Sequence, residues 1–150
     1  MKQASVWGVV TVLALVVAVV VLNRGAGSSS QPGGGAVALP WERDLSSALA
    51  RAGSENKIVM VDFYTDWCGW CRRFDQNTLS DSNVQRALER VVSVRLNAEK
   101  DGREAAERFR VDEYPTILFL DARGEEVGRI SGYFEPGPFL AEIEDIIRKA

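Results

Sequence analysis

The residues best suited to chemistry lie in the segment 65–74, TDWCGWCRRF, which contains the only two cysteines of the 150-residue chain, Cys68 and Cys71. Two thiols at this spacing can form a redox couple, a metal site or a structural disulfide, or can simply be small buried side chains. A structural disulfide would close a very short loop, so it would gain little chain entropy. Structural zinc needs four ligands, and beside this pair the chain offers only carboxylates because it has no histidine. We therefore favour a redox couple, while a two-thiolate Cu(I) carrier stays open.

The two cysteines are expected to have different roles. An apolar strand over residues 58–64 leads into a helix that begins near Cys68. Free backbone N–H groups and the positive end of the helix dipole stabilise a thiolate there, so we expect the pKa of Cys68 to fall below the usual value of about 8.5. Cys71 lies one turn further along the same helix. Cys68 is thus the predicted nucleophile, and Cys71 is the predicted resolving thiol that attacks a mixed disulfide.

Composition excludes several classes of protein. The absence of histidine removes the Ser/His/Asp and Cys/His forms of catalysis. The net charge is −3 and the pI is near 5.1, with no concentration of Lys and Arg, so nucleic acid is not an expected partner. A chain of this length is expected to form one core, and we expect a monomer.

Elements that could position the cysteines follow in an alternating order, which predicts an α/β sheet between helices. Asp44 is a candidate N-cap of the first helix, and Gly53 is its candidate end. The last helix places its apolar residues on one face. The expected strands are residues 58–64, 91–96, 116–120 and 126–131, and the expected helices are 45–52, one starting near residue 68, 82–90, 103–109, and one carrying Phe139, Leu140, Ile143, Ile146 and Ile147.

The N-terminal part divides into three further segments before the globular domain at residues 40–150. A short tail, residues 1–5, precedes an uncharged apolar run at residues 6–22, which is just long enough to span a membrane. We expect it to be a transmembrane anchor, since it exceeds the usual length of the apolar region of a signal peptide, although a cleaved signal peptide and a secreted domain remain the alternative. Residues 23–39 are rich in Gly and Ser and are expected to form a flexible linker.

Three separated segments of the globular part resemble the thioredoxin superfamily. They are VDFYTDWCGWC at residues 61–71, RLNAE at 95–99 and YPTILFLDARGEEVGRISGY at 114–133. The resemblance covers essentially residues 40–150 and implies a thioredoxin fold with a mixed central sheet flanked by helices. The WCGWC motif is most similar to membrane-tethered or secreted thioredoxin-like reductases and to the C-terminal domains of transmembrane thiol reductases. Thioredoxin itself has Gly-Pro between its cysteines, whereas this chain has Gly69 and Trp70, a difference that tunes the redox potential in a direction the sequence does not reveal.

The resemblance also assigns roles beyond the cysteines. Asp62 matches the buried acid that accepts a proton from the inner cysteine, and burial would raise its pKa toward neutrality. Pro115 matches the cis-proline beside the cysteine pair, which leaves the backbone of Tyr114 free to pair with a peptide. A core position remains an equal alternative for Trp67. The expected substrate-binding residues are Trp67, Gly69, Trp70, Tyr114, Pro115 and Gly132.

The function expected from this pattern is thiol-disulfide exchange with protein disulfides, mainly as a reductant or electron carrier outside the cytoplasm. The redox-active Cys68–Cys71 pair would need no further cofactor and no metal. A reductant in that location requires a membrane thiol protein as its electron donor. Three alternatives remain open: a thiol oxidase or isomerase, a Cu(I)-binding module, and a holdase that uses the aromatic residues around Cys68.

Overall fold

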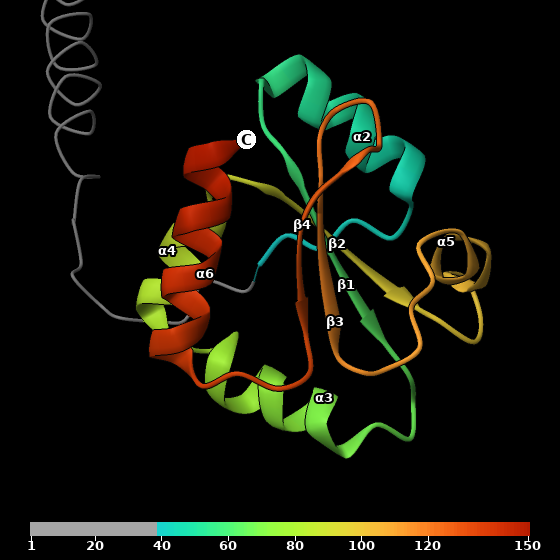
Figure 1. Ribbon diagram of the computed structural model, residues 1–150, viewed down its shortest axis with the longest axis vertical. Coiled ribbons are helices and arrows are strands. Elements are labelled where there is room, and N and C mark those ends of the chain that lie inside the picture. The colour runs from blue at the N-terminus through green and yellow to red at the C-terminus, as the bar shows by residue number, and fades with distance from the viewer. Residues whose placement is uncertain (1–38) are drawn as a thin grey trace, which may run out of the picture. The chain divides into compact units, whose positions relative to one another are not determined.

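The computed structural model describes residues 39–150 (Figure 1). The expected tail at residues 1–5, the expected anchor at 6–22 and all but the last residue of the expected linker at 23–39 lie outside the described residues. From residue 39 onward, no helix combines the length and the apolar character that crossing a membrane requires. The anchor therefore stays a prediction from the sequence.

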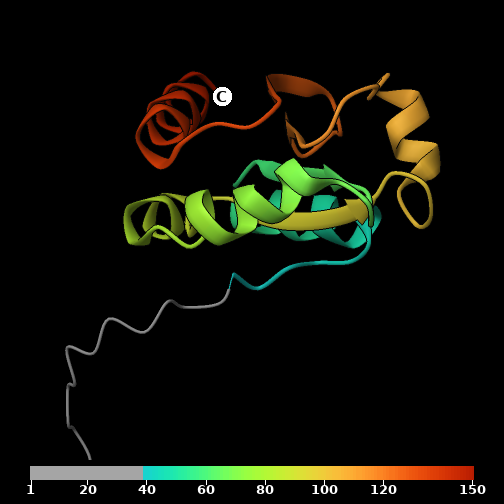
Figure 2. The ribbon, with the colours of Figure 1, turned by 90° about the horizontal axis from the view of Figure 1, so that it is seen from below.

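One mixed sheet organises the domain, with strand order β2-β1-β3-β4. Strands β1 and β2 are parallel, whereas β3 is antiparallel to both β1 and β4. Helix α3 lies at the end of the sheet where β1 terminates (Figure 1), as the view from that end also shows (Figure 2). The elements are α2 (Leu45–Glu55), β1 (Val59–Tyr64), α3 (Gly69–Arg73), the π-helix η1 (Phe74–Thr78), α4 (Ser82–Leu88), β2 (Val92–Asn97), α5 (Arg103–Arg108), β3 (Thr116–Leu120), β4 (Glu126–Ser131) and α6 (Pro136–Lys149).

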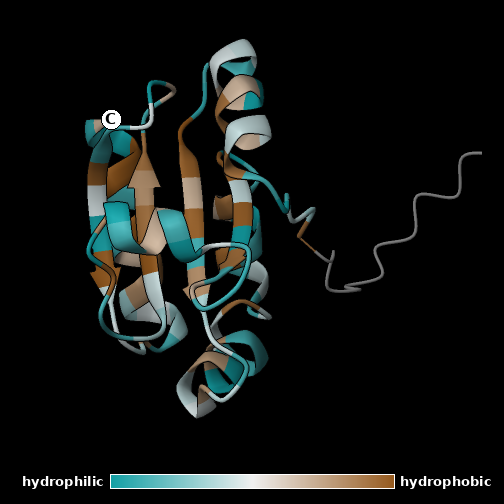
Figure 3. Ribbon diagram, turned by 90° about the vertical axis from the view of Figure 1, so that its right-hand side faces the viewer, coloured by the Kyte–Doolittle hydropathy of each residue, from teal (hydrophilic) through white to brown (hydrophobic). Residues whose placement is uncertain are grey.

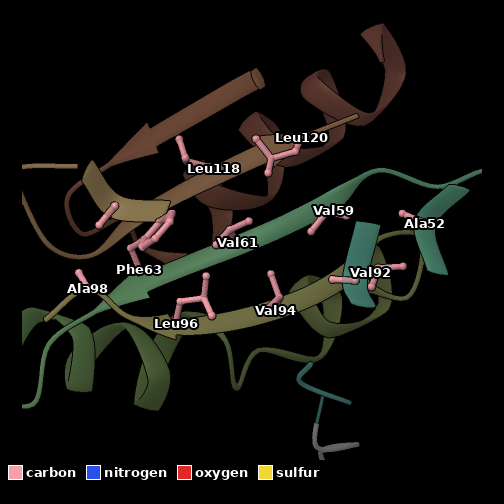
Figure 4. Packing of buried hydrophobic residues seen from close by; sticks show 12 residues of the cluster. Ala52, Val59, Val61, Phe63, Val92, Val94, Leu96, Ala98, Leu118 and Leu120 are labelled. Carbon is pink, nitrogen blue, oxygen red and sulfur yellow. The ribbon is translucent and has the colours of Figure 1, made fainter. Parts of the chain in front are cut away.

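Strands β1 and β3 are buried on both faces of the sheet and are almost wholly apolar, whereas the edge strand β4 is largely exposed. Most of the hydrophobic colour in Figure 3 follows the strands. Helices α2 and α5 cover one face, whose core is shown in Figure 4, and η1, α4 and α6 cover the other. The first face buries Ala48, Ala52, Val59, Val61, Phe63, Val92, Val94, Leu96, Ala98, Ala106, Leu118 and Leu120, and the second buries Met60, Phe74, Leu79, Val84, Ala87, Leu88, Val91, Ile117, Phe119, Ile130, Phe139 and Ile143.

The outer edge of β2 is partly covered by the segment that precedes α2. Glu42 forms an isolated parallel bridge with Val94. The backbone N–H of Glu42 donates to the carbonyl of Ser93 at 2.9 Å, and the backbone N–H of Arg95 donates to the carbonyl of Glu42 at 3.1 Å. This short pairing attaches the start of the described chain to the sheet and satisfies edge groups that would otherwise face solvent.

Most of the expected elements agree with the structure. Strands β3 and β4 have the expected bounds, β1 begins one residue later than expected, and β2 is shifted by one residue at both ends. Asp44 caps α2 by accepting a hydrogen bond from the N–H of Ser47 at 2.7 Å. The expectation that Gly53 ends this helix is wrong. The helix continues to Glu55, and Asn56 ends it in the left-handed conformation with φ of 53°. Asn tolerates that conformation well enough to take the place that glycine usually has after a helix.

Candidate active site

The cysteines lie where β1 passes into α3. Cys68 is the N-cap of α3, and its Sγ accepts a hydrogen bond from the backbone N–H of Cys71 at 3.0 Å. The two side chains form a disulfide, with their Cα atoms 5.3 Å apart. A sulfur at this position faces the free N–H groups of the first helical turn, an environment that favours a thiolate when the bond is reduced. The sequence prediction of a helix that starts at the first cysteine is therefore confirmed.

The disulfide is buried, while the tryptophan that precedes each cysteine in the sequence is exposed. Cys68 and Cys71 are 4% and 3% exposed, whereas Trp67 and Trp70 are 64% and 57% exposed. The alternative that placed Trp67 in the core is therefore wrong. Gly69, which follows Cys68, is also exposed. The two tryptophans are thus open to contact by a partner, whereas the two cysteines are nearly enclosed.

Asp62 lies in β1 and is buried, being only 1% exposed. The register of β1 and β2 pairs it directly with Arg95, so both side chains project from the same face of the sheet. Arg95 Nε lies 3.2 Å from Asp62 Oδ2, but this ion pair lacks hydrogen-bond geometry, and neither carboxylate oxygen has a hydrogen-bond partner in the described protein. The pKa of Asp62 is raised to about 7, because the loss of solvent on burial, helped by the nearby charge of Asp75, outweighs the attraction of Arg95.

Arg95 joins Asp62 to a second carboxylate. Its Nη2 donates to Asp75 Oδ2 at 2.8 Å. Asp75 lies in the π-helix η1, which directly continues α3, and a π-helical turn is often found at a functional site. Asp75 lies four positions after Cys71, so this short irregular helix carries the second carboxylate back toward the sheet, where β2 presents Arg95.

An open cavity of about 350 Å³ connects this charged cluster with the inner cysteine. The buried side-chain polar atoms without a hydrogen-bond partner in residues 39–150 belong to four residues: Asp62, Thr65, Asp75 and Arg95. Three of the four, all except Asp62, line this cavity, and Cys71 does too. Unpaired buried polar groups gathered at one cavity favour bound water. The cavity is lined by Arg43, Tyr64, Thr65, Asp66, Cys71, Arg72, Asp75 and Arg95.

One wall beside the disulfide is formed by Trp67. Its indole Nε1 donates to Glu99 Oε1 at 3.0 Å, and its ring meets that of Tyr114 edge to face, with centroids 6.0 Å apart. The peptide bond from Tyr114 to Pro115 is cis, as the resemblance implied. Gly132 follows β4, has a φ of +83°, and donates its N–H to the carbonyl of Pro115 at 2.8 Å. These contacts link four of the six expected substrate-binding residues, Trp67, Tyr114, Pro115 and Gly132, of which Pro115 is buried.

A second wall is formed by Trp70. Its ring lies 5.5 Å from that of Tyr133, and the guanidinium of Arg73 lies 5.7 Å from the Trp70 ring and 5.2 Å from the Tyr133 ring. Arg73 also pairs with Glu135 at 3.6 Å. Cation–π contacts of this kind hold an exposed aromatic side chain in place.

Sequence reasoning missed several residues of the site. Asp75 and Arg95 complete the charged cluster, and Glu99 and Tyr133 support the two tryptophans. Arg95 and Glu99 lie within the RLNAE segment already singled out, so that segment held a usable signal. The spacing of four between Cys71 and Asp75 was a second signal, since residues so spaced share a helix face.

This arrangement defines a class of site: a disulfide at a helix N-terminus, just after a strand of the sheet that carries a buried acid. The thioredoxin-like domain family matches residues 45–147. The chain belongs to this family.

Relatives of the chain are consistent with that assignment. It is 37% identical over 107 residues to the thiol:disulfide interchange protein DsbD of Salmonella paratyphi A and 35% identical over 106 residues to that of Yersinia pestis. These alignments cover 68% and 67% of this chain but only 18% of each relative, so the chain spans less than a fifth of their length.

Solved structures give the same fold. A thioredoxin from Thermus thermophilus has a TM-score of 0.66 and 35% identity, covering 73% of this chain and 88% of its own. The oxidised C-terminal domain of DsbD from Neisseria meningitidis has a TM-score of 0.59 and 22% identity, covering 70% and 97%. The second likeness supports the fold alone.

Proposed function

We propose that the chain is a thiol-disulfide oxidoreductase that reduces disulfides in other proteins. The observation that carries the proposal is the placement of a buried carboxyl group, Asp62, with a pKa of about 7, behind a disulfide whose outer sulfur caps a helix. In a chain without histidine, this group is the one suited to accept a thiol proton near neutral pH. The relatives' printed description as thiol:disulfide interchange proteins supports the same chemistry.

The reaction starts from the reduced pair. The thiolate of Cys68 attacks one sulfur of the substrate disulfide, which forms a mixed disulfide and releases the first substrate thiolate. Asp62 accepts the proton of Cys71, and the Cys71 thiolate then attacks the Cys68 sulfur. This step releases the second substrate thiolate, which takes up a proton from solvent or from Asp62. Two electrons pass to the substrate, and the domain is left with the Cys68–Cys71 disulfide seen in the structure.

The two tryptophan walls are proposed to hold the substrate segment over Cys68. Trp67 and Trp70 are more than half exposed, yet each has fixed partners, so little side-chain freedom is lost when a peptide binds. Tyr114 and Gly132 border the same surface. Large aromatic side chains that are held in place are typical of sites that contribute most of the binding energy.

The proposal also includes where the domain is located and in which direction it passes electrons. The apolar run at residues 6–22 and the Gly/Ser-rich segment after it suit a tethered domain outside the cytoplasm. There the oxidised pair would be reduced again by a dithiol of a membrane protein, which takes over the disulfide.

Insulin reduction in metal-free buffer tests the chemistry. We expect Cys68→Ser to abolish the activity, and we expect Val127→Ser, a change at an exposed residue of β4, to leave it intact. Activity that survives Cys68→Ser would disprove the proposed enzyme. The equilibrium potential of the pair against glutathione tests direction, since a reductase requires a potential below that of the glutathione couple, and a higher value would indicate an oxidase or isomerase.

Trapping in cells tests the partners. Cys71→Ser leaves the mixed disulfide at Cys68 without a resolving thiol, so covalently attached proteins can be isolated and identified. We expect these to include secreted or membrane proteins. Exclusively cytosolic partners would contradict the proposed location.

A further inference from the structure

The segment before α2 reaches the charged cluster from the outer edge of β2. Glu42 pairs with this edge on both sides of Val94, and one of its two hydrogen bonds comes from the backbone N–H of Arg95. The side chain of Glu42 is held in turn by Arg51 of α2, whose Nη1 lies 3.0 Å from Glu42 Oε1. The residues on either side of Glu42, Trp41 and Arg43, are therefore fixed next to β2.

Trp41 contacts the one arginine that the two carboxylates share. The guanidinium carbon of Arg95 lies 5.7 Å from the ring of Trp41 and 4.6 Å from the ring of Tyr64, both within cation–π range. Trp41 is half-buried and packs against the core cluster on the second face of the sheet. The ring of Trp41 therefore contacts both the core and the guanidinium of Arg95.

The orientation of Arg95 is not fixed by its carboxylate partners alone. Its contact with Asp62 lacks hydrogen-bond geometry, so its hydrogen bond to a carboxylate is the one to Asp75. The side chain is 22% exposed, so solvent offers the guanidinium an alternative environment. Aromatic rings beside the guanidinium favour the inward position, in which its charge lies next to Asp62.

We propose that Trp41 is a positioning residue of the redox site, which holds the guanidinium of Arg95 against Asp62 and Asp75. The inference rests on the proposed function, since it concerns the group that accepts the proton of Cys71. It also makes the junction between the Gly/Ser-rich segment and the domain a part of the site. Loss of the ring lets Arg95 turn toward solvent and leaves the two carboxylates with less positive charge between them.

The groups that face Asp62 determine whether the loss of Trp41 raises or lowers the pKa of Asp62. Arg95 of β2 lowers the pKa of Asp62, and Asp75 of η1 raises it. Strand β3, on the other side of β1, has no titratable residue in its sequence TILFL. Arg43, Tyr64, Asp66 and Arg72 are the other titratable groups that line the adjoining cavity, besides the disulfide-bonded Cys71. When Arg95 moves away, its attraction weakens while the repulsion by Asp75 remains, so the pKa of Asp62 rises.

The test is a carboxyl titration of the full-length oxidised chain, selectively labelled with ¹³C at aspartate Cγ and held in detergent micelles. Asp62→Asn identifies the Asp62 signal by its loss. We expect Trp41→Ala and Trp41→Leu to raise the midpoint of this signal by about one pH unit, as partial loss of a nearby opposite charge does. Trp41→Phe keeps a ring and is expected to retain the wild-type midpoint. Ile147→Ala, which removes bulk from the same core cluster on α6, serves as the matched control for a mere loss of packing.

A midpoint that rises in the Ala and Leu variants but not in the Phe variant supports the inference. A midpoint that stays within the change seen in Ile147→Ala overturns it. If Trp41→Ala does not fold, Trp41→Leu decides, since it keeps an apolar side chain there. The titration needs no thiol exchange, so its outcome is separate from that of the insulin assay, which tests the proposed function itself.

Discussion

Replacing Asp62 with asparagine is expected to make the oxidised chain more stable at alkaline pH. The pKa of Asp62 rises from an ordinary value of 3.8 to about 7 on folding, because burial penalises the charged carboxylate. The folded state therefore binds a proton that the unfolded state has lost between these two values. The stability linked to this proton is fully present below pH 3.8 and is lost as the pH rises through about 7.

The size of the effect follows from that difference. At roughly 1.4 kcal/mol for each pH unit, the interval from 3.8 to 7 corresponds to about 4 kcal/mol of lost stability once Asp62 is ionised. An asparagine amide avoids the charge, but it gives up the attraction of Arg95 and leaves a buried polar group without a partner, which costs about 1–3 kcal/mol. A net gain of about 1–3 kcal/mol at pH 8.5 is the expected result.

Urea unfolding of the oxidised chain at pH 5 and pH 8.5 measures the effect. Asp62→Asn is expected to gain stability relative to wild type at pH 8.5 and to gain little or nothing at pH 5. Asp44→Asn is the matched control, because the pKa of Asp44 is lowered to about 2 by its hydrogen bonds at the helix N-terminus and so lies below this range. A difference between Asp62→Asn and wild type that is equal at both pH values would refute the assignment of a raised pKa to Asp62.

Three further changes test separate parts of the structure. Asp75→Asn removes a charge that raises the pKa of Asp62, so the pH profile of insulin reduction is expected to shift toward acid; an alkaline shift would contradict this. Trp70→Ala is expected to lower kcat/KM about tenfold for insulin but less than twofold for a small aromatic disulfide. The reason is that only the protein substrate is large enough to contact the side chain of Trp70 while it reacts with Cys68. An equal loss for both substrates would place Trp70 in the chemistry rather than in binding. Gly128→Ala puts a Cβ within 2.8 Å of Ile146 Cδ1 and is expected to cost about 1–3 kcal/mol in urea unfolding. A cost below about 0.5 kcal/mol would show that α6 moves away easily.

The parts of the site that the sequence predicts are those that lie on one continuous stretch of chain. Asp62, Cys68 and Cys71 belong to a strand, a turn and the following helix, and local patterns describe each of these elements well. Asp75 and Arg95 join them only through the π-helix and the pairing of β1 with β2, which no local pattern reveals. Gly53 shows the same limit on a smaller scale, because a glycine inside a helix and a glycine that ends one look alike in sequence.

The alternative that placed Trp67 in the core is wrong for a physical reason as well. Trp67 carries a large apolar side chain, for which burial in the core is an ordinary fate, but Glu99 accepts its indole N–H and Tyr114 meets its ring at the surface. These partners lie 32 and 47 positions along the chain, so only the tertiary structure shows that the exposed position is supported.

The arrangement of charges around Asp62 explains how the chain provides a base near neutral pH without histidine. A buried carboxyl group with no counter-charge would have its pKa raised by desolvation alone, and a close arginine used by Asp62 alone would lower it strongly. Here Arg95 gives its hydrogen bond to Asp75 and only a poorly aligned contact to Asp62. The positive charge is thus divided between two acids, and the value of about 7 for the pKa of Asp62 is the balance of burial, a shared arginine and a neighbouring acid. A change to any of the three side chains moves this balance, and with it the pH at which Cys71 can lose its proton.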